Sequence, residues 1–77
     1  KIQAVLRKYE VLLIADEVIC GYGRTGNMWG SQTYGMAPDI LTSAKALTSA
    51  YMPLSAVMVN EAIYQACVAE SAKIGTF

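Results

Sequence analysis

An unbroken apolar run, residues 11–15, places the strongest constraint on the fold of this chain. The run is short, contains β-branched side chains and is apolar at every position, which is typical of a strand covered on both faces. Such strands occur in parallel sheets with helices on each side. The run ends at a carboxylate, Asp16, and a second strand-like segment, residues 40–44, is followed by the amine of Lys45. A charge that close to a buried segment has to be paired, shifted in pKa or used.

Besides the first apolar run, four segments of the chain have the patterns of helices or strands. Apolar positions recur at helical spacing at the start of the chain, and a second helix candidate follows Asn60, which is suited to be its N-cap. The helix candidates are residues 1–9 and 61–71, and the strand candidates are residues 39–44 and 54–59. The connection formed by residues 45–53 is short for a parallel return, so we expect the third strand to be antiparallel to the second. The order of these elements predicts an α/β layer fold.

The long segment between the first two strands predicts a loop. Residues 19–38 contain five of the six glycines, and a turn of helix is expected near residues 28–34. The connection is long enough for a crossover between parallel strands. In open α/β sheets ligands gather beyond the carboxyl ends of the strands, which is where Asp16 and Lys45 would then lie. We therefore expect these two side chains to share a site.

Length and composition exclude several classes of function. The chain has 77 residues, of which 55% are apolar and 16% charged, with a net charge of zero. The lack of a basic stretch argues against nucleic acid or a membrane surface as partner, and the apolar runs are far shorter than the roughly 20 residues of a membrane helix. Cys20 and Cys67 lack metal-ligand spacing and favour the cytoplasm, and no histidine is present to act as a base. Since 77 residues are marginal for a self-sufficient core, we expect an excerpt of a larger protein.

The glycine loop contains a pattern typical of dinucleotide-binding sites. Residues 21–26 match G-x-G-x-x-G after a strand, and Asp39 lies near the position of a ribose-binding acid. In a dinucleotide site, however, the first glycine comes straight off the strand and the last opens an apolar helix. Here residues 16–20 intervene, and Gly30 falls where the helix should run. We therefore interpret the glycines as allowing positive φ in a folded-back loop.

Five segments have residues and spacing in common with one family. They are residues 14–18, 21–26, 38–40, 43–47 and 48–57. In this order they resemble class III, pyridoxal-phosphate-dependent aminotransferases, most of all the ω-amino acid:pyruvate transaminase branch. The similarity extends from the first strand to Phe77, and the joint spacing carries it more than any single motif. It implies that residues 1–77 are the central part of the large, cofactor-binding domain of a fold-type I transferase, with a mostly parallel sheet.

The resemblance implies roles for three residues. Asp16 matches the aspartate that bonds the pyridine nitrogen of the cofactor and keeps it protonated. Val18 matches the apolar residue on one face of the cofactor ring, where a β-branched side chain is a stiff support. Lys45 matches the lysine that forms an imine with the cofactor and later carries a proton as general acid–base. Each has an ordinary alternative, respectively a turn-forming aspartate, a core valine and a strand-end lysine.

Other residues are left with two interpretations. Glu17 and Arg24 are expected to form an ion pair or to hold the loop. Four aromatic side chains could line a substrate pocket, or pack under the glycine loop or at a subunit interface: Tyr22, Trp29, Tyr34 and Tyr51. Contact with substrate or with a neighbouring subunit is possible for Thr48, Ser49 and Tyr51. Thr76 is not matched to the family's phosphate-binding threonine, which the resemblance places just beyond Phe77.

The function that the resemblance implies is transamination. The intact protein would move an amino group from an amine or ω-amino acid to a keto acid such as pyruvate, using pyridoxal 5'-phosphate, as a homodimer or higher homo-oligomer. An aminomutase or a decarboxylase would keep Asp16 and Lys45, and a nucleotide-binding oxidoreductase would use the glycine loop instead. The groups that bind the cofactor phosphate and the substrate carboxylate would lie outside the chain, so the isolated chain is expected to be inactive.

Overall fold

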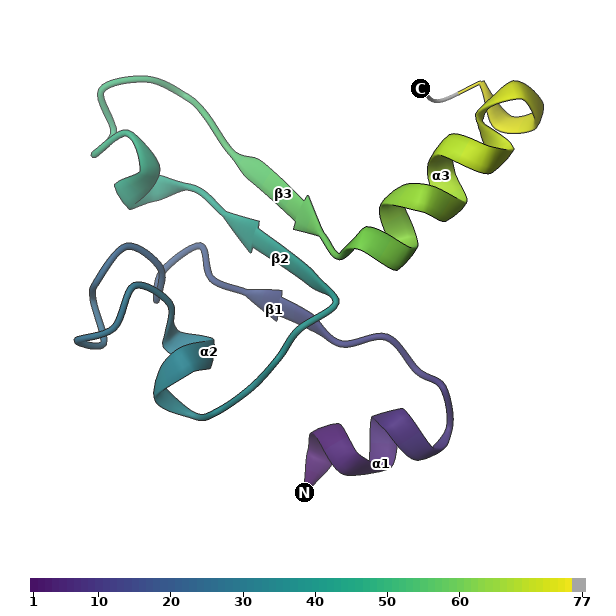
Figure 1. Cartoon of the computed structure of the whole chain (residues 1–77). Coiled ribbons are helices and arrows are strands. Elements are labelled where there is room, and N and C mark those ends of the chain that lie inside the picture. The colour runs from purple at the N-terminus through teal and green to yellow at the C-terminus, as the bar shows by residue number, and fades with distance from the viewer. Residues whose placement is uncertain (76–77) are drawn as a thin grey trace.

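The computed structural model describes residues 1–75, which form one three-stranded sheet with helices attached at its ends (Figure 1). The strands are β1 (Ile14–Asp16), β2 (Ile40–Ser43) and β3 (Ala56–Val59), in that order across the sheet. β1 runs parallel to β2, with Asp16 opposite Thr42, and β3 runs antiparallel to β2. The α/β class, the parallel first pair and the antiparallel third strand are therefore confirmed.

The helices and the glycine-rich loop lie at opposite ends of the sheet. α1 (Ile2–Lys8) precedes β1 and α3 (Glu61–Ile74) follows β3, so both lie at the end where β1 and β2 begin. At the other end, where β1 and β2 finish, lie the glycine-rich loop and a short 3₁₀ helix, η1 (Lys45–Leu47). The loop includes the single turn α2 (Gly30–Thr33), where the sequence predicts one.

β1 is shorter than the apolar run that predicts it. It begins at Ile14, whereas the run begins at residue 11. The carbonyl of Leu13 accepts the N–H groups of both Asp39 and Ile40, at 2.9 and 3.1 Å. These bonds lie at the point where the chain enters the sheet, so regular pairing of β1 starts only at the next residue.

α3 begins where the sequence predicts and ends later. Its N-cap is Asn60, whose Oδ1 accepts the N–H of Ile63 at 3.0 Å. The helix continues to Ile74 instead of residue 71 and ends at Gly75, which has a φ of +66°. Such a left-handed C-cap suits glycine because it has no Cβ. None of the helices in residues 1–75 has both the length and the apolar character needed to span a bilayer.

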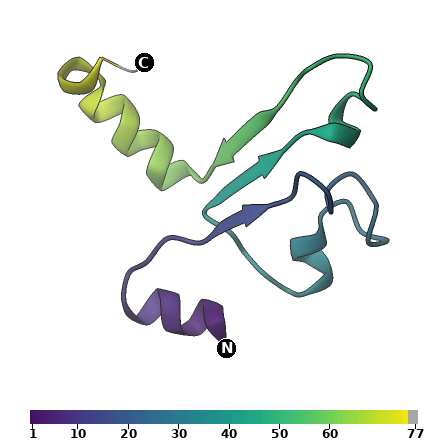
Figure 2. The same ribbon diagram turned by 180° about the vertical axis from the view of Figure 1, so that it is seen from behind.

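Both faces of the sheet are open within the described residues. Ala15 is the only apolar residue there that is buried, whereas Ile14 and Val57 are 60% and 66% exposed. The Cα trace measures 39 × 35 × 13 Å, and Figures 1 and 2 show no helix lying across the sheet. A helix layer packs about 10 Å from its neighbour, so a sheet covered on both sides is thicker than this. Within the described residues no helix provides the expected cover on the faces of β1, because α1 and α3 are attached at the sheet's end.

Asp39 makes that attachment, together with Arg7, Leu13 and Asn60. Its buried carboxylate accepts the N–H of Leu13 at 2.8 Å, Arg7 Nη1 at 3.1 Å and Asn60 Nδ2 at 2.9 Å. The Leu13 N–H and then the Arg7 guanidinium hold the pKa of Asp39 below its ordinary value of 3.8, against the opposing effect of burial. A ribose-binding role for Asp39 is therefore wrong, since its carboxylate already joins α1 to the residue before β1 and to the N-cap of α3. We call these four residues the Asp39 cluster.

Candidate active site

Asp16 and Lys45 lie at the same end of the sheet, as predicted. Asp16 is the last residue of β1, and Lys45 follows the last residue of β2 by two positions. Both are exposed, and together with Val18 they line a hollow of about 410 Å³. The other lining residues are Ile19 and Cys20. The structure thus brings the three predicted site residues to one hollow.

The carboxylate of Asp16 is oriented through only one of its two oxygens. Oδ1 accepts the N–H of Val18 at 3.1 Å and the hydroxyl of Thr42 at 3.3 Å. Within residues 1–75, no donor bonds Oδ2. A carboxylate held in this way can accept one more hydrogen bond, and the strongest come from cationic donors. The arrangement fits the protonated ring nitrogen of pyridoxal phosphate.

Lys45 has an unusual backbone conformation. Its φ is +46°, in the left-handed region, which costs a non-glycine residue on the order of 1 kcal/mol. The turn of η1 that it opens is closed by a bond from the N–H of Leu47 to the carbonyl of Ala44, at 3.0 Å. The ion pairs within residues 1–75 join other residues, so the Lys45 amine is available there to react with a carbonyl or to carry a proton.

The glycine loop folds back instead of opening a helix. Gly23 and Gly26 have φ values of +97° and +95°, which other residues rarely adopt. The next helix, α2, begins only at Gly30 and has four residues. A dinucleotide-binding loop needs a longer helix packed on the sheet after its last glycine. The interpretation as a folded-back loop is confirmed, and the geometry of a dinucleotide site is absent from residues 1–75.

Glu17 holds the loop without Arg24. Its buried carboxylate accepts the N–H groups of Gly30 and Ser31, at 2.6 and 2.9 Å. Arg24 is exposed and, with Lys45, lines a neighbouring hollow of about 220 Å³. Because no ion pair joins Glu17 and Arg24 in the described part of the chain, the ion-pair interpretation is wrong. The loop-holding interpretation is confirmed for Glu17.

Two contacts between the site's elements were not predicted from the sequence. Thr42 donates its hydroxyl to Asp16, and the hydroxyls of Tyr22 and Ser43 lie 2.9 Å apart in a hydrogen bond. Tyr22 also packs on Trp29, with ring centroids 4.9 Å apart. The contact of Thr42 with Asp16 depends on the register of β1 and β2, which places the two residues opposite each other. A local sequence pattern does not predict that register.

Of the remaining candidates, Thr48 and Ser49 line hollows of about 360 and 430 Å³ that Lys45 also lines. Tyr34 and Tyr51 are 78% and 90% exposed. Thr48 donates its hydroxyl to the carbonyl of Met52 at 2.8 Å and so closes a turn. Thr76 lies outside the described residues.

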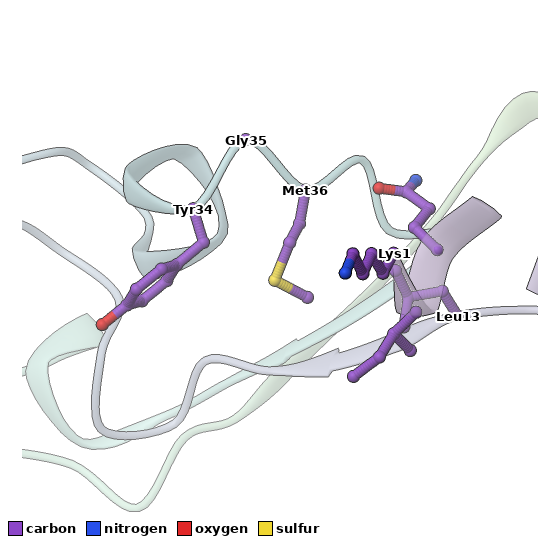
Figure 3. A pocket seen from close by; sticks show the side chains of 7 residues that line it. Lys1, Leu13, Tyr34, Gly35 and Met36 are labelled. Carbon is purple, nitrogen blue, oxygen red and sulfur yellow. The ribbon is translucent and has the colours of Figure 1, made fainter. Parts of the chain in front are cut away.

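A separate hollow, of about 390 Å³, lies at the other end of the sheet, beside α1. Its lining residues are Lys1, Ile2, Gln3, Leu13, Tyr34, Gly35 and Met36. Figure 3 shows Lys1 and Met36 on facing sides of it. No carboxylate lines this hollow, so it lacks the combination of acid and amine found at the hollow of Asp16 and Lys45.

Comparison with known sequences identifies similar proteins over the whole chain. The family model described as "Aminotransferase class-III" matches residues 1–77. The chain is 53% identical over 77 residues to vanillin aminotransferase of Capsicum frutescens, and 62% identical over 65 residues to diaminobutyrate–2-oxoglutarate transaminase of Halomonas elongata. These matches cover 100% and 84% of this chain. The chain spans only 17% and 14% of the length of these two relatives.

Solved structures match the fold as well as the sequence. A structure described as a transaminase with L-ala superposes with a TM-score of 0.92 at 60% identity, covering 97% of this chain and 18% of that one. The ω-transaminase of Pseudomonas jessenii, in complex with PMP, superposes with a TM-score of 0.92 at 49% identity, covering 97% and 17%. The three-stranded arrangement described above is therefore shared with these proteins.

Proposed function

Because this chain belongs to the class-III aminotransferase family, we propose that the intact protein moves an amino group from an amine or ω-amino acid to a keto acid such as pyruvate. Two similar structures support this choice of substrates. One is an ω-transaminase, and the other is described with L-ala, the amino acid that pyruvate becomes when it accepts an amino group. In this proposal residues 1–77 are the central part of the large, cofactor-binding domain.

The proposed cofactor is pyridoxal 5'-phosphate, held by Asp16, Val18 and Lys45. When bound, it supplies an aldehyde that condenses with amines and a cationic ring that withdraws electrons from the substrate. The unbonded Oδ2 of Asp16 would accept the ring N–H, and the paired charges would keep that nitrogen protonated. Val18 is half-buried at the same hollow, and its stiff β-branched side chain would support one face of the ring.

Lys45 has two tasks in this proposal. Its Nζ would attach the cofactor covalently by condensing with the aldehyde. Once an amine substrate has taken its place, the freed Nζ would take the proton from the substrate carbon that bears the amine. The observation that carries the proposal is that Asp16 and Lys45, which lie at the carboxyl ends of adjacent parallel strands, are exposed at one hollow.

Replacement of the lysine in the full-length protein tests this assignment. For Lys45→Ala we expect the formation of alanine from pyruvate to slow by roughly a thousandfold, because the proton carrier is lost. Lys8→Ala removes an exposed lysine of α1 and serves as the control, with activity close to that of the wild type. Normal turnover by the Lys45→Ala protein would show that the assignment is wrong.

The products distinguish transamination from other reactions of the same cofactor. An aminomutase would return an isomer of its substrate, and a decarboxylase would release carbon dioxide. Neither consumes pyruvate. Stoichiometric conversion of pyruvate to alanine in the presence of an amine is the result that the proposal predicts.

We further propose a homodimer or higher homo-oligomer that acts in the cytoplasm on small-molecule substrates. Support for the location comes from Cys20 and Cys67, which are free thiols of the kind kept in reducing compartments. Light scattering on the purified full-length protein measures the oligomeric state. Fractionation of cells measures the location.

A further inference from the structure

Glu17 stands between two of the proposed cofactor residues, Asp16 and Val18, and each of its polar atoms has a partner. Its N–H donates to the carbonyl of Thr42 at 2.8 Å, and its own carbonyl accepts the N–H of Gly21 at 2.9 Å. Its carboxylate oxygens accept one N–H each, from Gly30 and Ser31. The residue is therefore fixed by both its backbone and its side chain.

The two hydrogen bonds from backbone N–H groups stabilise the buried carboxylate of Glu17. The residue is only 5% exposed, and a buried carboxylate is costly unless it is hydrogen-bonded. No lysine or arginine within residues 1–75 forms an ion pair with it. Hydrogen bonds to an ionised group are about twice as strong as neutral ones, and the 2.6 Å bond to Gly30 is short even for this class.

Gly30 is required here for close approach, not for backbone conformation. A Cβ at this position would lie 2.9 Å from the Cβ of Cys20 and 3.1 Å from Oε1 of Glu17. A side chain at this position would have to displace Cys20 and would also crowd the Glu17 carboxylate. We call the contact between Glu17 and residues 30–31 the loop clamp.

We propose that Glu17 is a positioning residue, and that the loop clamp fixes the direction in which Asp16 faces the hollow. Glu17 directly follows the last residue of β1, and its carboxylate is held at Gly30 and Ser31, whereas its neighbours Asp16 and Val18 line the hollow. Asp16 Oδ1 accepts the N–H of Val18, so both ends of that bond move if the backbone at Glu17 turns. This inference rests on the proposed cofactor site.

The dissociation constant of the cofactor from full-length protein tests the proposal without relying on activity. Glu17→Gln keeps one acceptor oxygen but puts an amide nitrogen against a backbone N–H, so one bond of the clamp is lost. We expect pyridoxal phosphate to bind about tenfold more weakly, an effect of the size of one charge-assisted hydrogen bond. Asp16→Asn should weaken binding more, and Glu10→Gln, which changes an exposed glutamate, should leave it unchanged.

A second variant separates the clamp from the charge of Glu17. Gly30→Ala keeps the charge of Glu17 but crowds its carboxylate, together with the Cβ of Cys20, and so pushes the clamp open from the other side. If the clamp is the cause, Gly30→Ala weakens cofactor binding as Glu17→Gln does, and the double variant is little worse than either single one. Glu17→Asp, which keeps the charge and shortens the side chain, provides the same test if the Gln variant does not fold.

Three outcomes contradict the inference in distinguishable ways. A lower melting temperature of the apoprotein with unchanged cofactor affinity would make Glu17 purely structural. Weakening by Glu17→Gln but not by Gly30→Ala would assign the effect to charge instead of position. Unchanged affinity in Asp16→Asn would overturn the proposed cofactor site itself, and this inference with it.

Discussion

The two ends of the parallel strand pair each carry an aspartate, and the two carboxylates differ in how many partners they have. Asp39, at the end where β2 begins, is 4% exposed and accepts three hydrogen bonds that involve both oxygens. Asp16, at the end of β1, is exposed and accepts two, both at Oδ1. The two residues are of the same type, so the difference lies in their hydrogen-bond partners. Asp39 uses both oxygens to hold the fold, whereas Asp16, within residues 1–75, has one oxygen left to bind a ligand.

The basic residues at the two ends differ in the same way. Arg7 is paired with Asp39 at 3.1 Å, whereas Lys45 shares a hollow with Asp16 and forms no ion pair within residues 1–75. Pairing at one end stabilises the arrangement of α1, β1 and α3. At the other end the carboxylate of Asp16 and the amine of Lys45 remain available. The proposed cofactor requires both, because its ring nitrogen is a cation and its aldehyde condenses with an amine.

Among substitutions that test the difference between the two ends, Asp16→Asn is expected to have the largest effect, on the rate of proton abstraction. An amide at this position cannot keep the ring nitrogen protonated, so we expect proton abstraction to slow by roughly a hundred- to a thousandfold. The melting temperature of the apoprotein should change little, because Asp16 is exposed. Single-turnover kinetics of the half-reaction measure the effect, and an unchanged rate would contradict the role of Asp16.

Asp39→Asn should have the opposite pattern. An amide cannot accept all three bonds of the Asp39 cluster, because one of its two polar atoms is a donor. We expect a lower melting temperature of the apoprotein and a KM in the folded fraction close to that of the wild type. A protein that melted normally but lost activity would show that Asp39 belongs to the site and not to the fold.

The free energy of unfolding at acidic pH gives a second test of the structural role of Asp39. Because the pKa of Asp39 is lower in the folded state than its ordinary 3.8, the unfolded state binds more protons in this range. The contribution of Asp39 to stability is therefore complete at neutral pH and is lost as the pH falls below 3.8. Chemical denaturation at several acidic pH values should show this loss in the wild type and a smaller loss in Asp39→Asn.

A smaller effect is expected from Thr42→Val, which removes one of the two donors to Asp16 Oδ1. A hydrogen bond to a carboxylate is worth more than a neutral one, but this bond is exposed and long at 3.3 Å, so we expect a net effect of about 1 kcal/mol and a fall in kcat of roughly threefold to tenfold. Thr33→Val is the matched control, since Thr33 bonds Thr25 on the loop surface. Equal effects of the two substitutions would mean that Thr42 does not orient Asp16.

Local patterns in the sequence predicted the elements and placed Asp16 and Lys45 at one end of the sheet, and the family resemblance added Val18. The N-cap Asn60 was predicted from its own neighbours, and the antiparallel third strand from the length of one connection. These inferences succeed because the determining residues are close in sequence.

The contacts between distant residues could not be predicted in this way. The bond from Thr42 to Asp16 depends on the register of two strands, and the loop clamp depends on the path of the glycine loop. The role of Asp39 was missed for the same reason, because its partners Arg7, Leu13 and Asn60 come from three other elements. The apolar pattern around β1 indicated cover on both faces but could not say which residues provide it.

The most direct test of the central claim is to locate the cofactor on the full-length protein. Borohydride reduction makes the link between an amine and an aldehyde permanent, and peptide mass analysis then identifies the modified residue. We expect reduced pyridoxal phosphate on Lys45 in the wild type and in Asp16→Asn. Attachment to another lysine, or an unmodified Lys45 in an active holoprotein, would contradict it.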